Sequence, residues 1–252
     1  MSETPLITVV IATQLREDRL DYLTAMHASL TRQSVPWEAV VALDGADPAR
    51  LPTALSHDPR VRTVELPAVG AACARNLALT DVRTEFCNWA DDDDEFTDTA
   101  MARRLKILQA EGVGWCAGYS EDLHPDGTAS LWEAPAPPGR HEAGSVWTYW
   151  RSPADTIPIG PTTILARTEL MRAAPMGGLV QGEDYMTAVG ITSLAPGVVL
   201  PVPVYRYRKH EGQMTRQASY DQLEAAARRH AWHYGRSLRT ALRSVPAPVG
   251  SG

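Results

Sequence analysis

Two hydrophobic periodicities alternate along the first half of this 252-residue chain, and this alternation restricts the fold more than any other feature. Short runs of apolar, often β-branched residues predict strands at 6–12, 38–43, 61–66 and 86–90. Apolar residues at helical spacing predict helices between them, at 20–30, 51–55 and 74–78. Repeated βα units predict an α/β fold with a doubly wound, mainly parallel sheet covered by helices on both faces.

The second half of the chain has fewer regular patterns than the first. We expect a helix at 97–110, a strand at 113–119, a hairpin turned by "PDG" at 125–127, a strand at 162–166 and helices at 168–174 and 182–190. Ser219 and Gln222 form a capping-box pattern that opens a closing helix at 219–243, before a tail at 246–252. We divide the chain into portions at 1–120 and 121–218 of one domain, followed by the closing helix and tail at 219–252.

Composition excludes several classes of protein. A net charge of −6 and a pI near 5.6 argue against a general nucleic-acid or anionic-membrane binder, which would carry a basic surface. The apolar run at 6–12 is too short for a membrane span or a signal-peptide core, so we expect a cytoplasmic protein without integral membrane association. Cys73, Cys87 and Cys116 are widely spaced and indicate neither a disulfide framework nor a zinc site.

Polar clusters follow three of the predicted strands. The first strand ends at "ATQLRED", the second at "LDGADP" and the fourth at "ADDDDE". Ligands of open α/β sheets bind beyond the carboxyl ends of the strands. We therefore expect these three clusters to converge on one edge of the sheet and to form a binding site there.

Four consecutive aspartates at 91–94, which we call the acidic turn, form the most charged of these clusters. Adjacent carboxylates repel one another by roughly 3 kcal/mol for each close pair at an effective dielectric near 20. One interpretation is a solvated turn that caps the following helix, since carboxylates favour helix N-termini. A calcium loop of the EF-hand type is excluded, because Phe96 and Ala102 stand where glycine and glutamate are required.

A divalent-metal site that holds a phosphorylated ligand is the third interpretation of the acidic turn. In an extended segment Asp91 and Asp93 point the same way and Asp92 points elsewhere. Such oxygen ligands suit Mg²⁺ or Mn²⁺, which proteins usually hold with one or two carboxylates together with phosphates of the ligand. The fourth interpretation, a phosphatase-type nucleophile, ranks low because that motif normally ends the first strand of its domain.

Several segments, taken in their order, resemble the family-two glycosyltransferases of the GT-A fold. They are "VVIATQLRED", "VVALDGADP", "GAACARNLAL", "FCNWADDDDEF", "GEDY" and "YRYRKHEGQMT". The resemblance spans roughly 5–215. It implies a Rossmann-like, nucleotide-sugar-binding half at 1–120 and an acceptor-side portion with the catalytic base at 121–218.

The resemblance also implies roles for individual residues. Asp184 matches the general base, Asp93 and His210 match metal ligands, with Asp91 as a further candidate, and Arg208 lies on the diphosphate side. Glu183 and Trp150 are candidate acceptor contacts, although Glu183 and Asp184 could instead be simple dipole partners of a helix and Trp150 a packing residue. The positions expected to bind the donor nucleotide and sugar are Thr13, Gln14, Leu15, Glu17, Asp44, Arg75, Asn76, Asp91 and Asp92.

The implied activity is a metal-dependent, inverting transfer of a sugar from a nucleoside-diphosphate donor, with UDP as the default nucleotide. The acceptor would be a small molecule, a natural product or an envelope precursor; the implied cofactor is Mn²⁺ or Mg²⁺, nucleic acid is not a partner, and a homodimer stays open. Ala12, Leu15 and Leu43 depart from the family pattern near the base. Two alternatives are a non-catalytic nucleotide-sugar- or metal-binding module and a sugar-nucleotide pyrophosphorylase, which would need a glycine-rich loop that "ATQLRED" lacks.

Overall fold

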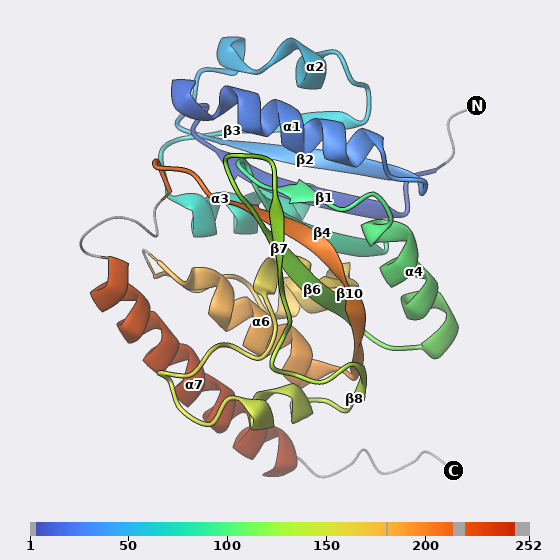
Figure 1. Ribbon diagram of the computed structural model, residues 1–252, viewed down its shortest axis with the longest axis vertical. Coiled ribbons are helices and arrows are strands. Elements are labelled where there is room, and N and C mark those ends of the chain that lie inside the picture. Colours follow the sequence, from blue (N-terminus) through green and yellow to red (C-terminus); the bar gives the residue numbers. More distant parts are fainter. Residues whose placement is uncertain (1–3, 180, 214–219, 245–252) are drawn as a thin grey trace.

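The computed structural model describes residues 4–179, 181–213 and 220–244. Its first half contains the βα units that the sequence predicts (Figure 1). They are β1 (Ile7–Thr13), α1 (Leu20–Thr31), β2 (Trp37–Asp44), α2 (Thr53–Ser56), β3 (Val61–Leu66), α3 (Ala71–Ala78) and β4 (Phe86–Asp91). A short 3-10 turn, Glu17–Arg19, precedes α1.

The second half adds further strands to the sheet and a second group of helices. Its elements are β5 (Glu95–Phe96), α4 (Ala100–Glu111), β6 (Trp115–Leu123), β7 (Ala129–Trp132), β8 (Gly139–His141), β9 (Leu165–Arg167), α5 (Thr168–Ala173), α6 (Glu183–Leu194), β10 (Gly197–Arg208) and α7 (Tyr220–Ser244). Figure 1 shows α6 and α7 side by side on the opposite side of the sheet from α1 and α2.

All strands in the described part of the chain join one sheet, in the order β3-β2-β1-β4-β9-β6-β10-β5, with β7 beside β6 and β8 beside β10. The first four strands of this order are parallel, as the βα pattern predicts. β9 is antiparallel to both β4 and β6, whereas β6 and β10 are again parallel. The fold is therefore α/β, with the doubly wound sheet that we expected.

Alternate residues of β1 point into two separate hydrophobic cores. Val9 and Ile11 pack with apolar residues of α1 and α4, whereas Val10 and Ala12 pack with α3 and with a larger core that includes α6 and α7. Successive side chains of a strand point to opposite faces, so a strand covered by helices on both sides has to be apolar throughout. This requirement explains the unbroken run "ITVVIA".

β10 is the long strand that the sequence analysis did not predict. Pro201 and Pro203 lie within it, and proline normally argues against a strand inside a sheet because it cannot donate a hydrogen bond. The structure accommodates both prolines at register shifts against β6, between Val199 and Pro203 and again between Pro203 and Tyr205. The predicted cap residue Ser219 and the tail at 246–252 lie outside the described residues.

A buried arginine fixes the position of the turn at 161–163 next to β4. Arg104 of α4 is fully buried, and its guanidinium donates to the Asn88 side chain in β4 and to the Thr163 carbonyl oxygen at 2.8 Å. Asn88 also donates to the Thr162 carbonyl oxygen at 2.9 Å. Because a buried polar group that loses its partners is costly, these bonds tie the 161–163 turn firmly to β4.

Gly197, the first residue of β10, pairs with Trp115 of β6, whose indole is fully buried. A methyl group at Gly197 would overlap the Trp115 ring. We expect Gly197→Ala to lower the free energy of unfolding by about 1–3 kcal/mol, because the packed indole has no room to move. Gly178→Ala is the control, since a methyl group there meets no atom within 4 Å. Equal denaturant midpoints for the two variants would contradict this packing.

Candidate active site

A cavity of about 920 Å³ lies at the carboxyl ends of β1, β2 and β4. All three polar clusters predicted to converge contribute to its wall. These contributions are Thr13 and Gln14 after β1, Asp44 at the end of β2, and Asp91, Asp92 and Asp93 at the end of β4. The prediction that these strand ends converge on one edge of the sheet is therefore confirmed by the structure.

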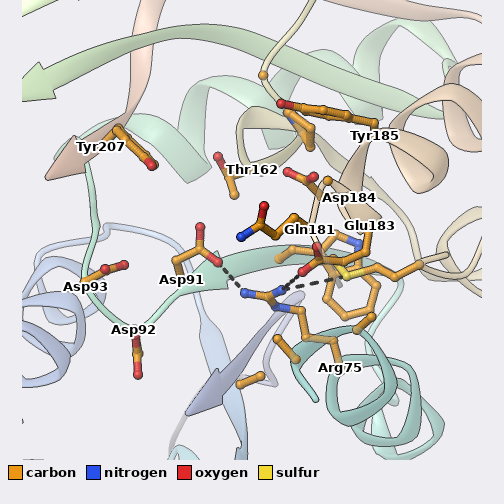
Figure 2. A pocket seen from close by; sticks show the side chains of 18 of the residues that line it. Arg75, Asp91, Asp92, Asp93, Thr162, Gln181, Glu183, Asp184, Tyr185 and Tyr207 are labelled. Carbon is orange, nitrogen blue, oxygen red and sulfur yellow. Dashed lines mark hydrogen bonds and ion pairs between the residues drawn. The ribbon is translucent and has the colours of Figure 1, made fainter. Parts of the chain in front are cut away.

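The acidic turn divides its carboxylates between two directions. Figure 2 shows Asp91 and Asp93 on one side of the chain and Asp92 pointing the opposite way. Asp92 accepts a hydrogen bond of 2.6 Å from the Thr13 hydroxyl and so joins the ends of β1 and β4. Asp94 is fully buried and accepts a hydrogen bond of 2.8 Å from the backbone N–H of Arg208. Asp91 and Asp93 thus lie on the same side of the chain, and both line the cavity.

Two arginines offset the negative charge of the acidic turn. Arg75 of α3 is bonded to Asp91 and lies 3.3 Å from a carboxylate oxygen of Glu183, so it bridges β4 and α6 (Figure 2). Arg19 lies 2.9 Å from Asp93 and 3.3 Å from Asp92, and it donates to the Gly212 carbonyl oxygen at 2.9 Å. Each guanidinium can serve two carboxylates because it offers several donors in a fixed plane.

Burial nevertheless raises the pKa values of several carboxylates in this region, which makes them harder to ionise. Burial raises the pKa of Asp92, and the neighbouring Asp93 raises it further. Burial also raises the pKa of Asp94 well above its ordinary value, with Asp91 and Asp93 adding to the effect. Burial raises the pKa of Asp91 even though Arg75 opposes the shift. The region therefore favours an additional positive charge over a further negative one.

Asp184 lies in the first turn of α6 and lines the same cavity (Figure 2). Burial raises the pKa of Asp184 to about 7, and the carboxylates of Glu183 and Asp91 contribute to this shift. A carboxylate with a pKa near neutrality accepts a proton far more readily than an ordinary surface aspartate. The adjacent Glu183 also lines the cavity, but its carboxylate is bonded to Arg75, so the two acidic side chains have different surroundings.

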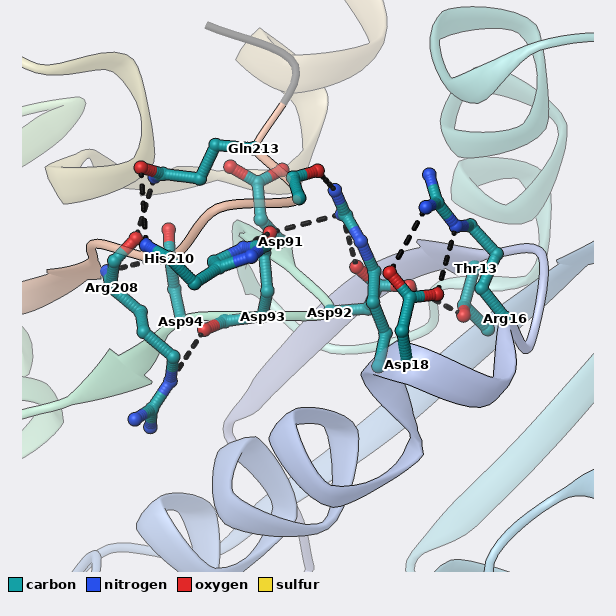
Figure 3. Close-up of polar contacts among 12 residues, drawn as sticks. Thr13, Arg16, Asp18, Asp91, Asp92, Asp93, Asp94, Arg208, His210 and Gln213 are labelled. Atoms are coloured by element: carbon teal, nitrogen blue, oxygen red, sulfur yellow. Dashed lines mark hydrogen bonds and ion pairs between the residues drawn. The ribbon is translucent and has the colours of Figure 1, made fainter. Parts of the chain in front are cut away.

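The groups expected to bind a divalent cation lie next to each other. The His210 Nε2 atom is 2.9 Å from a carboxylate oxygen of Asp93, and Figure 3 shows His210 beside the acidic turn. No three His, Cys, Asp or Glu side chains come together as a complete cage among the described residues. Mg²⁺ is commonly held by one or two carboxylates with phosphates supplying further ligands, and Asp91 and Asp93, which both line the cavity, are carboxylates of the kind that such a cation uses.

Asp44 holds the opposite end of the cavity in place. One of its carboxylate oxygens accepts hydrogen bonds from the backbone N–H groups of Val69, at 2.6 Å, and Gly70, at 3.1 Å. Its other oxygen is 3.4 Å from the amide nitrogen of Gln14. Asp44 therefore fixes the loop before α3 and still presents an oxygen atom toward the cavity, where it could accept a hydrogen bond from a nucleotide base.

Six predicted residues do not contribute to the cavity wall, and one of them is His210, whose imidazole is bonded to Asp93. Leu15 is buried in the core with a left-handed backbone at φ 48°, and Glu17 forms an exposed ion pair with Arg50. Asn76 exchanges two hydrogen bonds with the backbone of Met176, so it supports the cavity indirectly. The two others are Arg208, which is bonded to Glu95 and the Asp93 carbonyl oxygen, and Trp150, which is buried against Trp147.

Sequence reasoning missed several residues that the structure brings to the cavity. Four of them, with polar or aromatic side chains, are Arg19, Trp132, Gln181 and Tyr207. The alternating "YRYR" segment has the period of a strand and indicates that its two tyrosines share one face, so Tyr207 could have been found. No local pattern points to Arg19, Trp132 or Gln181, because their positions depend on how distant loops pack.

Comparisons with known proteins agree with this geometry. The model of glycosyl transferase family 2 matches residues 8–156. β-1,4 N-acetylgalactosaminyltransferase 1 of Rattus norvegicus is 36% identical over 120 residues, which are 47% of this chain and 21% of that protein. The enzyme of the same name from Mus musculus is 35% identical over 121 residues, with the same shares of both chains. The chain thus spans about a fifth of the length of these curated relatives.

Solved structures show the same fold. Residues 1–349 of S. aureus TarS in complex with UDP-GlcNAc superpose with a TM-score of 0.64 at 16% identity, over 94% of this chain and 71% of that chain. The complex of the same protein with UDP gives a TM-score of 0.62 at 18% identity, over 95% of this chain and 75% of that chain. Likeness at these identities establishes the GT-A fold and not the activity.

The family match covers more than half of the chain and includes Thr13, Asp44 and the whole acidic turn. The fold, the polar strand ends and this match agree with one another. The chain belongs to glycosyl transferase family 2 and has the GT-A fold.

Proposed function

We propose that this glycosyltransferase transfers an N-acetylhexosamine from its UDP-linked form to an acceptor hydroxyl, by a single displacement that inverts the anomeric centre. The observation that carries the proposal is Asp184, whose pKa near 7 and place in the cavity wall suit a general base. Asp91 and Asp93 line the same cavity, so a donor bound to the acidic turn would lie within the same enclosed space.

The choice of donor rests on the neighbours and on the two ends of the cavity. The relatives in Rattus norvegicus and Mus musculus are named for N-acetylgalactosamine transfer, and the TarS structure contains UDP-GlcNAc. In our proposal the uracil ring of the donor binds near Asp44 and Gln14, and the diphosphate lies against the acidic turn. A carboxylate oxygen at Asp44 is the acceptor that a uracil N–H requires.

The proposed metal site uses Asp93 and His210, with Asp91 close by. A bound Mg²⁺ or Mn²⁺ would stabilise the charge that develops on the departing diphosphate. Support comes from the excess of carboxylates in this region, because neighbouring aspartates contribute to the raised pKa values of Asp91, Asp92 and Asp94 and a cation would offset that repulsion. Arg19 would then add a fixed positive charge on the same side, since it already contacts Asp92 and Asp93.

The proposed transfer needs one proton acceptor and no covalent intermediate. Asp184 removes the proton of the acceptor hydroxyl while the oxygen attacks the anomeric carbon. The bond from that carbon to the diphosphate breaks, and UDP leaves with the bonding electrons. Arg75 keeps Asp91 and Glu183 in place beside Asp184 throughout, so it positions the reacting groups.

The alternative of a non-catalytic nucleotide-sugar-binding module has less support. A binding module has no need of a half-buried carboxylate whose pKa is about 7 and which faces the cavity. The small molecule, natural product or envelope precursor that we expect as acceptor would occupy the part of the cavity beyond Asp184.

Replacing Asp184 with Asn tests the assigned base. We expect kcat to fall at least about 100-fold, because general-base catalysis contributes roughly that much or more. Thermal stabilisation by UDP should be retained, since the donor nucleotide does not contact Asp184 in our proposal. The rate of the wild-type enzyme should rise with pH and level off above about pH 7, where Asp184 is ionised. An Asp184→Asn variant with unchanged turnover would contradict the assignment.

The same variant predicts a pH-dependent difference in stability. The pKa of Asp184 is raised in the folded state, so the folded protein holds this proton more tightly than the unfolded chain does. The wild type therefore loses stability as the pH rises from the ordinary aspartate pKa, about 3.9, to about 7, and this loss cannot occur in Asp184→Asn. We expect the variant to melt several degrees higher at pH 8, at roughly 2–4 °C for each kcal/mol. The difference should shrink toward pH 4, and a constant difference would exclude the shifted pKa.

Metal dependence can be measured without turnover. We expect UDP to raise the melting temperature in the presence of Mg²⁺ or Mn²⁺, and EDTA to remove most of that increase. Asp93→Asn should lose most of the metal-dependent increase, because Asp93 supplies a ligand. Asp98→Asn is the control, since the Asp98 side chain is 66% exposed and pairs with Arg32. If EDTA and Asp93→Asn have no effect, the proposed metal site is wrong.

A further inference from the structure

One face of the β7–β6–β10 ladder forms a wall of the cavity. Trp132 of β7 lies opposite Ser120 of β6, which lies opposite Tyr205 of β10. One step further along, Asp122 of β6 lies opposite Tyr207. Paired residues share a face of a sheet, as do residues two positions apart in a strand. The members of this face that line the cavity are Ser120, Asp122, Trp132, Tyr205, Tyr207 and Lys209.

A local irregularity of β10 aligns the two tyrosines with this face. The register between β10 and β6 shifts between Pro203 and Tyr205, and the strand then continues in step through Arg208. Bulges of this kind are a common way to redirect side chains beside a binding site. The other face carries Arg206, which pairs with Glu121 at 2.9 Å, and Leu131, which is 53% exposed.

The aromatic wall faces the proposed base. Figure 2 shows Tyr207 across the cavity from Tyr185, with Thr162 and Asp184 on the path between them. Trp132 is only partly buried, and it lines the same cavity. Aromatic rings on both walls offer flat apolar surfaces to a ring-shaped ligand, and their negative faces attract its C–H groups.

The polar groups of this part of the cavity suit an uncharged ligand with hydroxyl groups. Lys209 pairs with Asp122 at 3.0 Å, and Arg228 pairs with Glu224 at 2.8 Å, so both of these cations already have a carboxylate partner. Gln181 is 4% exposed, and its side-chain oxygen has no hydrogen-bond partner among the described residues. Since a buried acceptor without a partner is costly, this oxygen is suited to accept a hydrogen bond from a hydroxyl group of a ligand.

We infer that the acceptor is a neutral pyranose sugar, whose ring lies against Trp132 and Tyr207 and whose reacting hydroxyl points toward Asp184. This inference rests on the proposed function and adds the chemical class of its second substrate. Asp122 and Gln181 bind other hydroxyl groups of the ring. In the transfer the hydroxyl proton passes to Asp184, the new C–O bond forms at the anomeric carbon, and UDP leaves with the electrons of the broken bond.

An acceptor panel tests the inference directly. The purified chain is incubated with UDP-GlcNAc or UDP-GalNAc, Mn²⁺, and p-nitrophenyl glycosides of neutral hexoses and N-acetylhexosamines. The comparison acceptors are the matching glucuronide and a peptide rich in serine and threonine. We expect transfer to at least one neutral glycoside, with a kcat/KM at least about tenfold higher than for the glucuronide or the peptide. A preference for the glucuronide or the peptide would overturn the inference.

Variants on the two faces of β7 provide the matched control. Trp132→Ala should raise KM for the neutral glycoside at least about tenfold, because the aromatic contact and its buried area are lost. Leu131→Ala truncates the neighbouring side chain, which is 53% exposed on the outer face, and should leave that KM unchanged. Equal KM values for the two variants would overturn the inference.

Thermal stabilisation by UDP separates this test from the proposed function. Stabilisation of both variants by UDP, at the same midpoint as the wild type, shows that they are folded and bind the nucleotide. If the wild type is stabilised by UDP but transfers sugar only to the glucuronide or the peptide, the acceptor inference alone is wrong. If UDP neither stabilises the wild type nor is released from the donor, the proposed function fails, and the acceptor inference fails with it.

Discussion

The pairing of two arginines with a crowded set of carboxylates is the interaction on which the rest of this site depends. Arg75 joins Asp91 to Glu183, and Arg19 joins Asp92 and Asp93 to the backbone at Gly212. Without these cations the carboxylates would repel one another inside a region of low dielectric. The same bonds connect β4 to α3, to α6 and to the segment after β10. The ion pairs that offset the charge therefore also hold together the elements that surround the cavity.

The two arginines do not fully offset the effects of burial and of neighbouring carboxylates, so the pKa values of several of these carboxylates stay raised. Burial keeps the pKa values of Asp91, Asp92 and Asp94 raised despite the arginines, which favours an added cation. Asp184 is close enough to Glu183 and Asp91 for their charges to raise its pKa to about 7. In our proposal one acidic cluster supplies metal ligands on the donor side and a base on the acceptor side, and the surroundings of each carboxylate set which of these functions it has.

The sequence predicted those strands and site residues that depend on local patterns of apolar and polar residues. The βα alternation predicted β1 to β4, and parallel strand ends had to bring Thr13, Asp44 and the acidic turn together. β10 was not predicted, because its prolines mask a strand whose register shifts only the assembled sheet reveals. Arg19 contacts Asp92, which lies 73 residues further along the chain, and no local sequence pattern predicts this pairing. Spacing alone also failed to distinguish Trp150, which is buried in the core, from Trp132, which lines the cavity.

The stereochemistry of the product tests the central claim most directly, because one displacement with Asp184 as base can have only one outcome. The glycoside formed from an α-linked UDP-N-acetylhexosamine can be isolated early in the reaction and its anomeric configuration read from the proton NMR coupling at the new linkage. The account predicts a β-linked product. An α-linked product would contradict it, since retention requires a different mechanism and a different function for Asp184.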